Sequence, residues 1–143
     1  MANNLINNSR VKVKVKKGAK SVSSRRWLER QLNDPYVLAA KNDGYRSRSA
    51  YKLIEINEKN NLFKKGQAVV DLGSAPGGWS QVASKFIGSP NKGKIVSIDI
   101  QDVEPIEGVI FINGSIMDEE IITVIKQKLA SKADLIISDM APH

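Results

Sequence analysis

Short apolar runs alternate with amphipathic segments through the second half of the chain, and this alternation constrains the possible folds more than any other feature. The runs are rich in β-branched residues and apolar on both faces, which is typical of strands buried in a parallel sheet. The segments between them have the spacing of helices that pack one face on a sheet. The pattern therefore predicts a parallel α/β sheet with flanking helices. The expected strands cover residues 67–72, 94–99, 109–112 and 134–139, and the expected helices 79–86 and 118–130.

Three helices and a tail are expected before this α/β region. Asp34 followed by Pro35 is a typical helix start, and Ser47 or Ser49 can start the third helix. Trp27 is expected to anchor the first helix in a core. The sequence thus divides into a basic flexible tail over 1–22, a basic helical segment over 23–66 with helices at 24–33, 35–44 and about 47–59, and the α/β domain over 67–143.

Positive charge is concentrated at the start of the chain. Residues 1–66 contain 16 Lys and Arg against 5 Asp and Glu, whereas residues 67–143 contain 6 against 10. A basic segment beside an acidic domain is typical of a surface that faces a polyanion. A solvated segment that only aids solubility is the alternative. The charge pattern favours a nucleic acid as the partner.

Composition excludes several kinds of site. The chain has no cysteine and a single histidine, at its last position. Disulfides, thiol catalysis and zinc sites built from cysteines or several histidines are therefore excluded, and we expect no metal. The lack of cysteine fits a cytoplasmic protein. No apolar run is long enough to span a bilayer, so we expect no membrane contact.

A glycine-rich loop lies between the first expected strand and the helix after it. Its sequence is Asp71-Leu72-Gly73-Ser74-Ala75-Pro76-Gly77-Gly78-Trp79. Glycines let the backbone turn sharply and approach a ligand closely. The spacing is not the dinucleotide-binding G-x-G-x-x-G, and Pro76 removes an N–H that a pyrophosphate would use. The acid at the strand end suits a ligand with ammonium and sulfonium charges, which indicates S-adenosylmethionine.

The second expected strand also ends in an acid, Asp99. Carboxyl ends of neighbouring parallel strands line the crevice in which α/β sheets bind ligands, and a carboxylate there can accept hydrogen bonds from both ribose hydroxyls. Acids that only cap helices or turns are the alternative for Asp71 and Asp99. Together with the loop and the strand order, the two acids favour an adenosyl cofactor.

Several motifs of the chain resemble those of the FtsJ/RrmJ-type RNA 2′-O-methyltransferases, in the order found in that family. Residues 69–81 resemble the family's cofactor loop, and 138–142 (Ser-Asp-Met-Ala-Pro) resemble its second hallmark. Residues 46–53 resemble its R-S-R-x-x-[YF]-K-L segment. Residues 24–28 and 34–37 look like the start of bacterial members that modify a uridine of 23S ribosomal RNA. The resemblance runs from about residue 23 to the end.

The resemblance implies a Rossmann-like S-adenosylmethionine methyltransferase fold, of which this chain would be the N-terminal portion. The implied reaction moves a methyl group from S-adenosylmethionine to the ribose 2′-oxygen of a uridine in 23S rRNA, within the large ribosomal subunit. We expect the protein to be a monomer. The family uses a lysine–aspartate–lysine–glutamate set. Lys52 and Asp139 match the first two catalytic positions, and the second lysine and the glutamate are absent from this chain.

Cofactor contacts are expected from Asp71, Gly73, Gly77, Trp79, Asp99, Ser115 and Asp139. Ser115 stands where the family usually has an aspartate near the adenine. A serine can still hydrogen-bond an amino group, but without a carboxylate's charge. Trp79 can instead pack under the loop, since indoles are usually mostly buried.

Four arginines are candidates for RNA contacts: Arg25, Arg26, Arg46 and Arg48. All four could instead be surface residues that aid solubility. Phosphate contacts are favoured for Arg46 and Arg48, because they lie next to the helix of Lys52.

The last expected strand would sit beside the first and leave a wholly apolar edge, which natural sheets normally cover. We therefore expect the chain to be incomplete and its own methyl transfer to be negligible. Three alternatives remain at this point. They are a catalytically inactive fragment, a non-enzymatic RNA-binding module that uses the basic segment, and an NAD-type oxidoreductase, against which the missing G-x-G-x-x-G argues.

Overall fold

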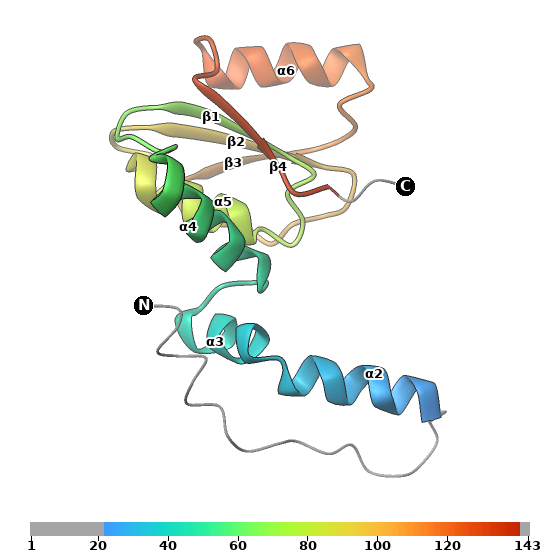
Figure 1. Ribbon diagram of the computed structural model, residues 1–143. Coiled ribbons are helices and arrows are strands. Elements are labelled where there is room, and N and C mark those ends of the chain that lie inside the picture. Colours follow the sequence, from blue (N-terminus) through green and yellow to red (C-terminus); the bar gives the residue numbers. More distant parts are fainter. Residues whose placement is uncertain (1–21, 141–143) are drawn as a thin grey trace.

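The computed structural model describes residues 22–140 (Figure 1). The predicted tail lies outside the described residues except for Val22, and so do residues 141–143. The elements expected from the sequence are present in the expected order. None of the helices in this described part is long and apolar enough to cross a membrane.

Four parallel strands form the centre of the molecule: β1 (Ala68–Leu72), β2 (Lys94–Asp99), β3 (Val109–Asn113) and β4 (Leu135–Ser138). Their spatial order is β3-β2-β1-β4. The strand starts are aligned, because Ala68 pairs with Lys94 and Val69 with Leu135. The predicted parallel sheet is confirmed, and the carboxyl ends of its strands share one edge, where ligands of such sheets bind.

Helices cover both faces of the sheet. Figure 1 shows α4 (Ser49–Asn60) and α5 (Gly78–Ile87) on one face and α6 (Glu119–Leu129) on the other. This arrangement explains why the strands are apolar on both sides, since neighbouring residues of a strand point to opposite faces.

Each face has its own apolar core. Val69 and Ile95 pack with Leu53 of α4 on one side of the sheet. Val70 packs with Ile125 of α6 on the other side. The two cores fix α4 and α6 against the sheet, and α4 carries Lys52 to the carboxyl edge of the strands.

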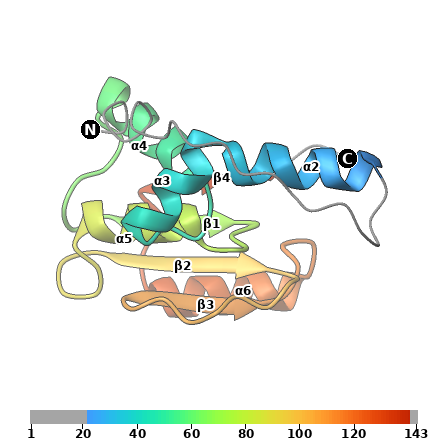
Figure 2. The same cartoon turned by 90° about the horizontal axis from the view of Figure 1, so that it is seen from below.

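Two helices precede the sheet, α2 (Val22–Asn33) and α3 (Pro35–Asp43). They lie apart from the strands on the side of α4 and α5 (Figure 1), and Figure 2 looks at the molecule from that side. The predicted start of α3 is confirmed, because the Asp34 side chain accepts hydrogen bonds from the N–H groups of Tyr36 and Val37. The helix ends at Gly44, which has the left-handed backbone conformation that favours glycine.

One predicted helix start is confirmed and one local prediction is wrong. Helix α4 begins at Ser49, one of the two serines expected to start it, and Arg48 occupies the cap position without a capping side-chain bond. The hydroxyls of Ser47 and Ser49 lie 2.7 Å apart and share a hydrogen bond. Trp27 is not a core anchor: it is 54% exposed on α2, which packs against α3.

The apolar edge expected at β4 is present in the described part of the chain. β4 pairs with β1, and no described strand covers its other side. Ile136 of β4 is 61% exposed, whereas the next residue, Ile137, is buried against the α4–α5 core.

Candidate functional site

The loop between β1 and α5 is packed too closely for side chains at two of its glycines. Gly77 has a φ of +117°, which favours glycine. A Cβ atom on Gly77 would lie 2.7 Å from Cδ1 of Ile106, and one on Gly78 would collide with Oγ of Ser47. The glycines therefore let the start of α4 and the β2–β3 connection close on the loop.

A cavity of about 710 Å³ opens at the carboxyl edge of β1, β2 and β3. Its walls are mostly apolar, with Ile98, Ile116 and Met140 among them, and its polar side chains include Asp99 and Ser115. The size and the few polar groups are those of a small-molecule site. A flat ring can lie against these apolar side chains, with the Asp99 carboxylate beside it.

Backbone N–H groups fix the Asp99 carboxylate. Its Oδ2 accepts from the N–H of Ala75 at 2.8 Å, and its Oδ1 accepts from the N–H of Gln101 at 2.9 Å. Each carboxylate oxygen can accept two hydrogen bonds. One acceptor position on each oxygen therefore remains, which suits a ligand with two adjacent hydroxyls.

The second strand-end acid, Asp71, is buried beneath the loop. Its Oδ2 accepts a 2.6 Å hydrogen bond from Oγ of Ser80. Oγ of Ser80 in turn lies 2.6 Å from Oγ of Ser97, and the two hydroxyls share a hydrogen bond. Burial raises the pKa of Asp71 to about 7, the charges of Asp139 and Asp99 add to the rise, and the Ser80 bond opposes it. A cation beside Asp71 would favour the ionised carboxylate.

A narrow cavity of about 30 Å³ lies between the loop and the start of α4. Asp71, Ser74 and Asp139 line it, and Gly73 lines both this cavity and the large one. Oγ of Ser74 is buried and has no hydrogen-bond partner in the described part of the chain. Because a buried hydroxyl without a partner is unfavourable, a polar ligand group fits this position.

A third cavity of about 490 Å³ lies beside α4, lined by Arg48, Lys52 and Glu55 among others. Ser49 and Asp139 line both this cavity and the narrow one. The three cavities therefore lie next to one another and share wall residues, in a row from the carboxyl edge of β2 to the outer surface of α4. We call this row the cavity path.

The two predicted catalytic residues meet at the junction of this path. Nζ of Lys52 donates to Oδ1 of Asp139 at 3.4 Å, although the residues are 87 positions apart in the sequence. Both side chains are partly exposed, so the ion pair adds little stability. It does hold an ammonium group in the wall of the third cavity, beside Asp139, which lines both the narrow and the third cavity.

Trp79 and Ser115 lie at the site in different ways. Trp79 is buried in the core between α4 and α5, and its indole N–H donates to the carbonyl of Ser49 at 2.9 Å. It packs under the loop and also lines the narrow cavity. Ser115 lines the large cavity, and its hydroxyl accepts from the N–H of Met117 at 3.1 Å.

Arg46 has a role that the sequence did not reveal. Its guanidinium donates to the carbonyl oxygens of Pro76 and Glu104, and to that of Pro105 at 2.8 Å. Its backbone N–H donates to Oε1 of Gln81. Arg46 thus ties the glycine-rich loop and the β2–β3 connection to the segment before α4. The sequence carried no signal for these bonds, because the acceptors are backbone carbonyls.

The other three candidate RNA contacts are more exposed or more distant. Arg48 pairs with Asp34, stacks on the Tyr36 ring at 5.4 Å and lines the third cavity. Arg25 and Arg26 lie on α2 and line none of the three cavities. Residues 22–140 contain no group of side chains able to hold a metal ion.

A parallel α/β sheet with a cavity across the carboxyl ends of its strands, and an acid at or near the end of each of the two central ones, defines an α/β protein with a small-molecule site at the carboxyl edge of its sheet. A model of the FtsJ-like methyltransferase family matches residues 45–143, which include Lys52, Asp71, Asp99 and Asp139. The chain belongs to the FtsJ-like methyltransferase family.

Relatives and a solved structure agree with this assignment. Over 135 residues the chain is 53% identical to proteins named Ribosomal RNA large subunit methyltransferase E from Brucella ovis and Brucella canis. The match covers 94% of this chain and 56% of those proteins, so the chain spans about half their length. A structure of a ribosomal RNA methyltransferase from Plasmodium falciparum superposes with a TM-score of 0.61 at 37% identity, covering 69% of this chain and 58% of that one.

Proposed function

We propose that this chain binds S-adenosylmethionine and takes part in moving its methyl group to the ribose 2′-oxygen of a uridine in 23S rRNA, in the large ribosomal subunit of the cytoplasm. The observation that carries the proposal is the cavity path, the row of three neighbouring cavities from Asp99 past Asp71 to the Lys52–Asp139 pair. A methyl donor and a methyl acceptor can approach each other from the two ends of such a path.

Each part of the cofactor has a matching part of the path. The adenosine fits the large cavity, with its ribose hydroxyls on Asp99 and its adenine near Ser115. The ammonium group of the methionine end would face the narrow cavity, which at about 30 Å³ takes a single polar group and is lined by Asp71, Asp139 and the unpartnered Ser74 hydroxyl. When bound, S-adenosylmethionine supplies an electrophilic methyl group on a sulfonium.

The third cavity suits the RNA. Arg48 and Lys52 line it and supply positive charge for phosphates or for oxygen atoms that gain negative charge. A ribose hydroxyl is a poor nucleophile, and a nearby ammonium such as that of Lys52 stabilises the oxyanion that develops as it attacks. Asp139 orients this ammonium by accepting its hydrogen bond.

A methyl-transfer assay tests the proposal. The match covers 56% of the Brucella ovis protein. Two proteins are therefore assayed: this chain alone, and a fusion in which it is followed by the remaining residues of the Brucella ovis protein. The substrate is large subunits that lack the modification, with labelled S-adenosylmethionine as donor. The label should appear in 2′-O-methyluridine with the continued chain, and Lys52→Ala should abolish it. Label in a base, or full activity of Lys52→Ala, contradicts the proposal.

A second candidate is an RNA-binding module without enzymatic activity, which the basic segment over 23–66 favours. The two candidates differ in their need for the cofactor. A folded chain that binds RNA but gives no heat with S-adenosylmethionine supports the binding module instead.

A further inference from the structure

The lysines of the α/β domain gather at the edge of the sheet opposite the cavities. Residues 67–143 contain six lysines and no arginine. Every one of them lies in the last turn of α5 or α6, in the connection that follows one of these helices, or at the first residue of β2. In a parallel sheet these positions share the amino edge of the strands. Lys64 and Lys65, just before β1, belong to the same edge.

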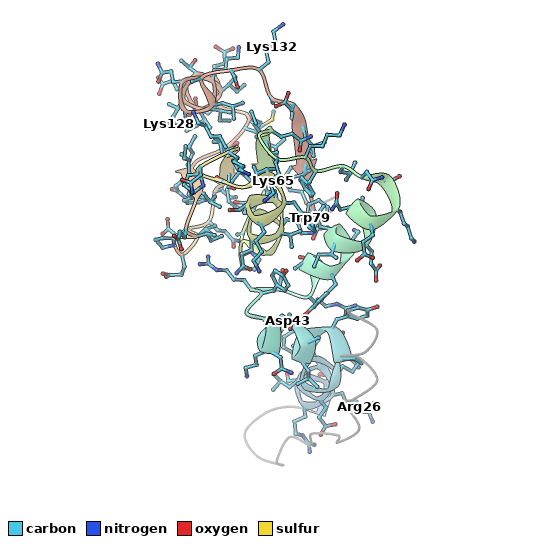
Figure 3. All side chains as sticks on the ribbon, turned by 90° about the vertical axis from the view of Figure 1, so that its left-hand side faces the viewer. Arg26, Asp43, Lys65, Trp79, Lys128 and Lys132 are labelled. Carbon is cyan, nitrogen blue, oxygen red and sulfur yellow. The ribbon has the colours of Figure 1, made fainter. Side chains whose placement is uncertain are left out.

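Five of these side chains form what we call the amino-edge patch: Lys64, Lys65, Lys92, Lys128 and Lys132. All five are exposed, and none has an ion-pair partner among residues 22–140. Three lysines are left out. Lys85 stacks on the Tyr45 ring and Lys94 donates to the carbonyl of Leu129. Lys126 lies further from the end of α6 than Lys128 does. Figure 3 looks onto this edge, with Lys65 near α5 and Lys128 and Lys132 at the end of α6.

A groove lies within the same edge of the sheet. This hollow of about 280 Å³ is lined by residues 66–68, by Pro90, by Lys92 to Lys94 and by Leu129 to Ser131 at and just after the end of α6. No acidic side chain lines it. The stems of Lys65 and Lys92 converge, since both come within 3.4 Å of the position that a Cβ on Gly88 would occupy. The groove therefore has Lys92 and Lys94 in its wall, and Lys65 and Lys132 are the sequence neighbours of the wall residues at its two ends.

Helix dipoles do not account for this charge. The C-termini of α4, α5 and α6 point to this edge, and each contributes roughly −0.5 of a charge, about −1.5 together. Lysines in a last turn, such as Lys128, compensate such ends. Lys64, Lys65, Lys92 and Lys132 lie in connections, beyond the helices. The acids at this edge are Glu58, Glu107 and Asp134, and the Asp134 carboxylate already accepts the N–H of Ala68.

We propose that the amino-edge patch binds the phosphate backbone of RNA. This would be a second RNA contact, at the edge of the sheet opposite the cavities. The choice of RNA as the partner rests on the proposed function. The lysines lie on separate connections along an open groove, so they can contact successive phosphates of one RNA backbone. Such contacts depend on charge and not on the base sequence. One rRNA segment would then lie at the cavities while another lies across the amino edge.

Salt dependence of binding tests the proposal. The full chain is titrated with a labelled RNA hairpin at several salt concentrations, without cofactor. A triple variant carries Lys65→Gln, Lys92→Gln and Lys132→Gln and so loses three phosphate contacts. The slope of log K against log salt should become less steep by about 2 to 3, at roughly 0.9 per contact for a duplex. The charge-preserving triple of Lys65→Arg, Lys92→Arg and Lys132→Arg is the matched control and should keep the slope. A glutamine triple with an unchanged slope overturns the proposal.

Lysine labelling shows where the RNA binds. Acetylation of Lys65, Lys92, Lys128 and Lys132 should slow several-fold when the hairpin is bound, and equal labelling with and without RNA overturns the proposal. Polyglutamate is added as a competitor. If it displaces the hairpin and protects the same lysines as strongly, the partner of the patch is an acidic protein and the proposal is overturned. A failure to bind S-adenosylmethionine would count against the proposed function and leave these measurements unaffected.

Discussion

At the scale of single residues, burial decides the pH at which Asp71 ionises. Its carboxyl is 1% exposed, and burial raises its pKa to about 7 from the 3.8 of an exposed aspartate. Below pH 3.8 both the folded and unfolded chains hold the proton of Asp71, so this group gives the free energy of unfolding no pH dependence there. As the pH rises to about 7, the unfolded chain has released the proton and the folded chain still holds it, so stability falls.

Asp71→Asn should therefore stabilise the protein at high pH. The amide cannot ionise, and its oxygen can still accept the Ser80 hydrogen bond. The free energy of unfolding of the variant should exceed that of the wild type above about pH 7, by at most roughly 4 kcal/mol, and the gain should vanish near pH 4. Urea unfolding at a series of pH values measures this. A constant difference between the two proteins at all pH values would contradict the assignment.

Ser115 gives a second prediction at this scale. It lines the large cavity where the family usually has an aspartate, and its hydroxyl is uncharged. Ser115→Asp should tighten binding of S-adenosylmethionine, because a hydrogen bond from the adenine amino group to a carboxylate is roughly twice as strong as one to a hydroxyl. We expect a gain of about 3- to 10-fold, or roughly 1 kcal/mol. Ser115→Ala is the control and should weaken binding, and weaker binding by Ser115→Asp would place the adenine elsewhere.

The sequence predicted the residues of the site better than their partners. Asp71, Asp99 and Asp139 could be placed together because parallel strands bring their carboxyl ends to one edge. The hydroxyls of Ser80 and Ser97 beneath Asp71 were not predicted, since a serine in a helix or strand has many possible partners. Distances between side chains depend on packing, which periodicity does not encode.

At the scale of elements, Arg46 couples the loop of the cofactor site to the helix of Lys52. Arg46→Lys keeps the charge but cannot reach three carbonyl oxygens at once. The loss of one or two hydrogen bonds should weaken binding of S-adenosylmethionine by about 5- to 30-fold, at roughly 1 kcal/mol each. Calorimetry measures the change.

Arg48→Lys is the matched control for Arg46, because the two arginines are two positions apart and Arg48 makes an exposed ion pair with Asp34. It should change cofactor affinity by less than about twofold. Equal effects of the two substitutions would contradict the role of Arg46 in positioning the loop.

The order and type of the elements could be predicted because each segment has a clear period and clear ends. The start of α3 at Asp34 is an example, since cap and proline were both visible. The start of α4 could be narrowed to Ser47 or Ser49, and the helix begins at Ser49, but the sequence did not show that Arg48 would occupy the cap position. The exposure of Trp27 could not be predicted, because it depends on where α2 packs, and α2 lies apart from the sheet.

At the scale of the whole molecule, the free side of β4 is the most exposed apolar part of the sheet. Ile136 is 61% exposed, and an uncovered apolar strand is a template for pairing with another copy. Ile136→Lys should reduce self-association at high protein concentration and change stability by less than about 0.5 kcal/mol, because the side chain is exposed. Sedimentation velocity and thermal unfolding measure the two effects. Self-association that is unchanged in this variant would place the contact on another surface.

The central claim for the molecule as a whole is that S-adenosylmethionine binds in the cavity path, and calorimetric titration of the full chain tests this claim most directly. S-adenosylmethionine should bind with one-to-one stoichiometry, and NAD should not bind. Asp99→Asn, which keeps a similar shape but loses acceptor capacity, should weaken binding by about tenfold or more, since hydrogen bonds to a charged group contribute roughly 1.5–3 kcal/mol. A folded wild-type chain that gives no heat with S-adenosylmethionine, or an Asp99→Asn variant that binds equally well, would contradict the account.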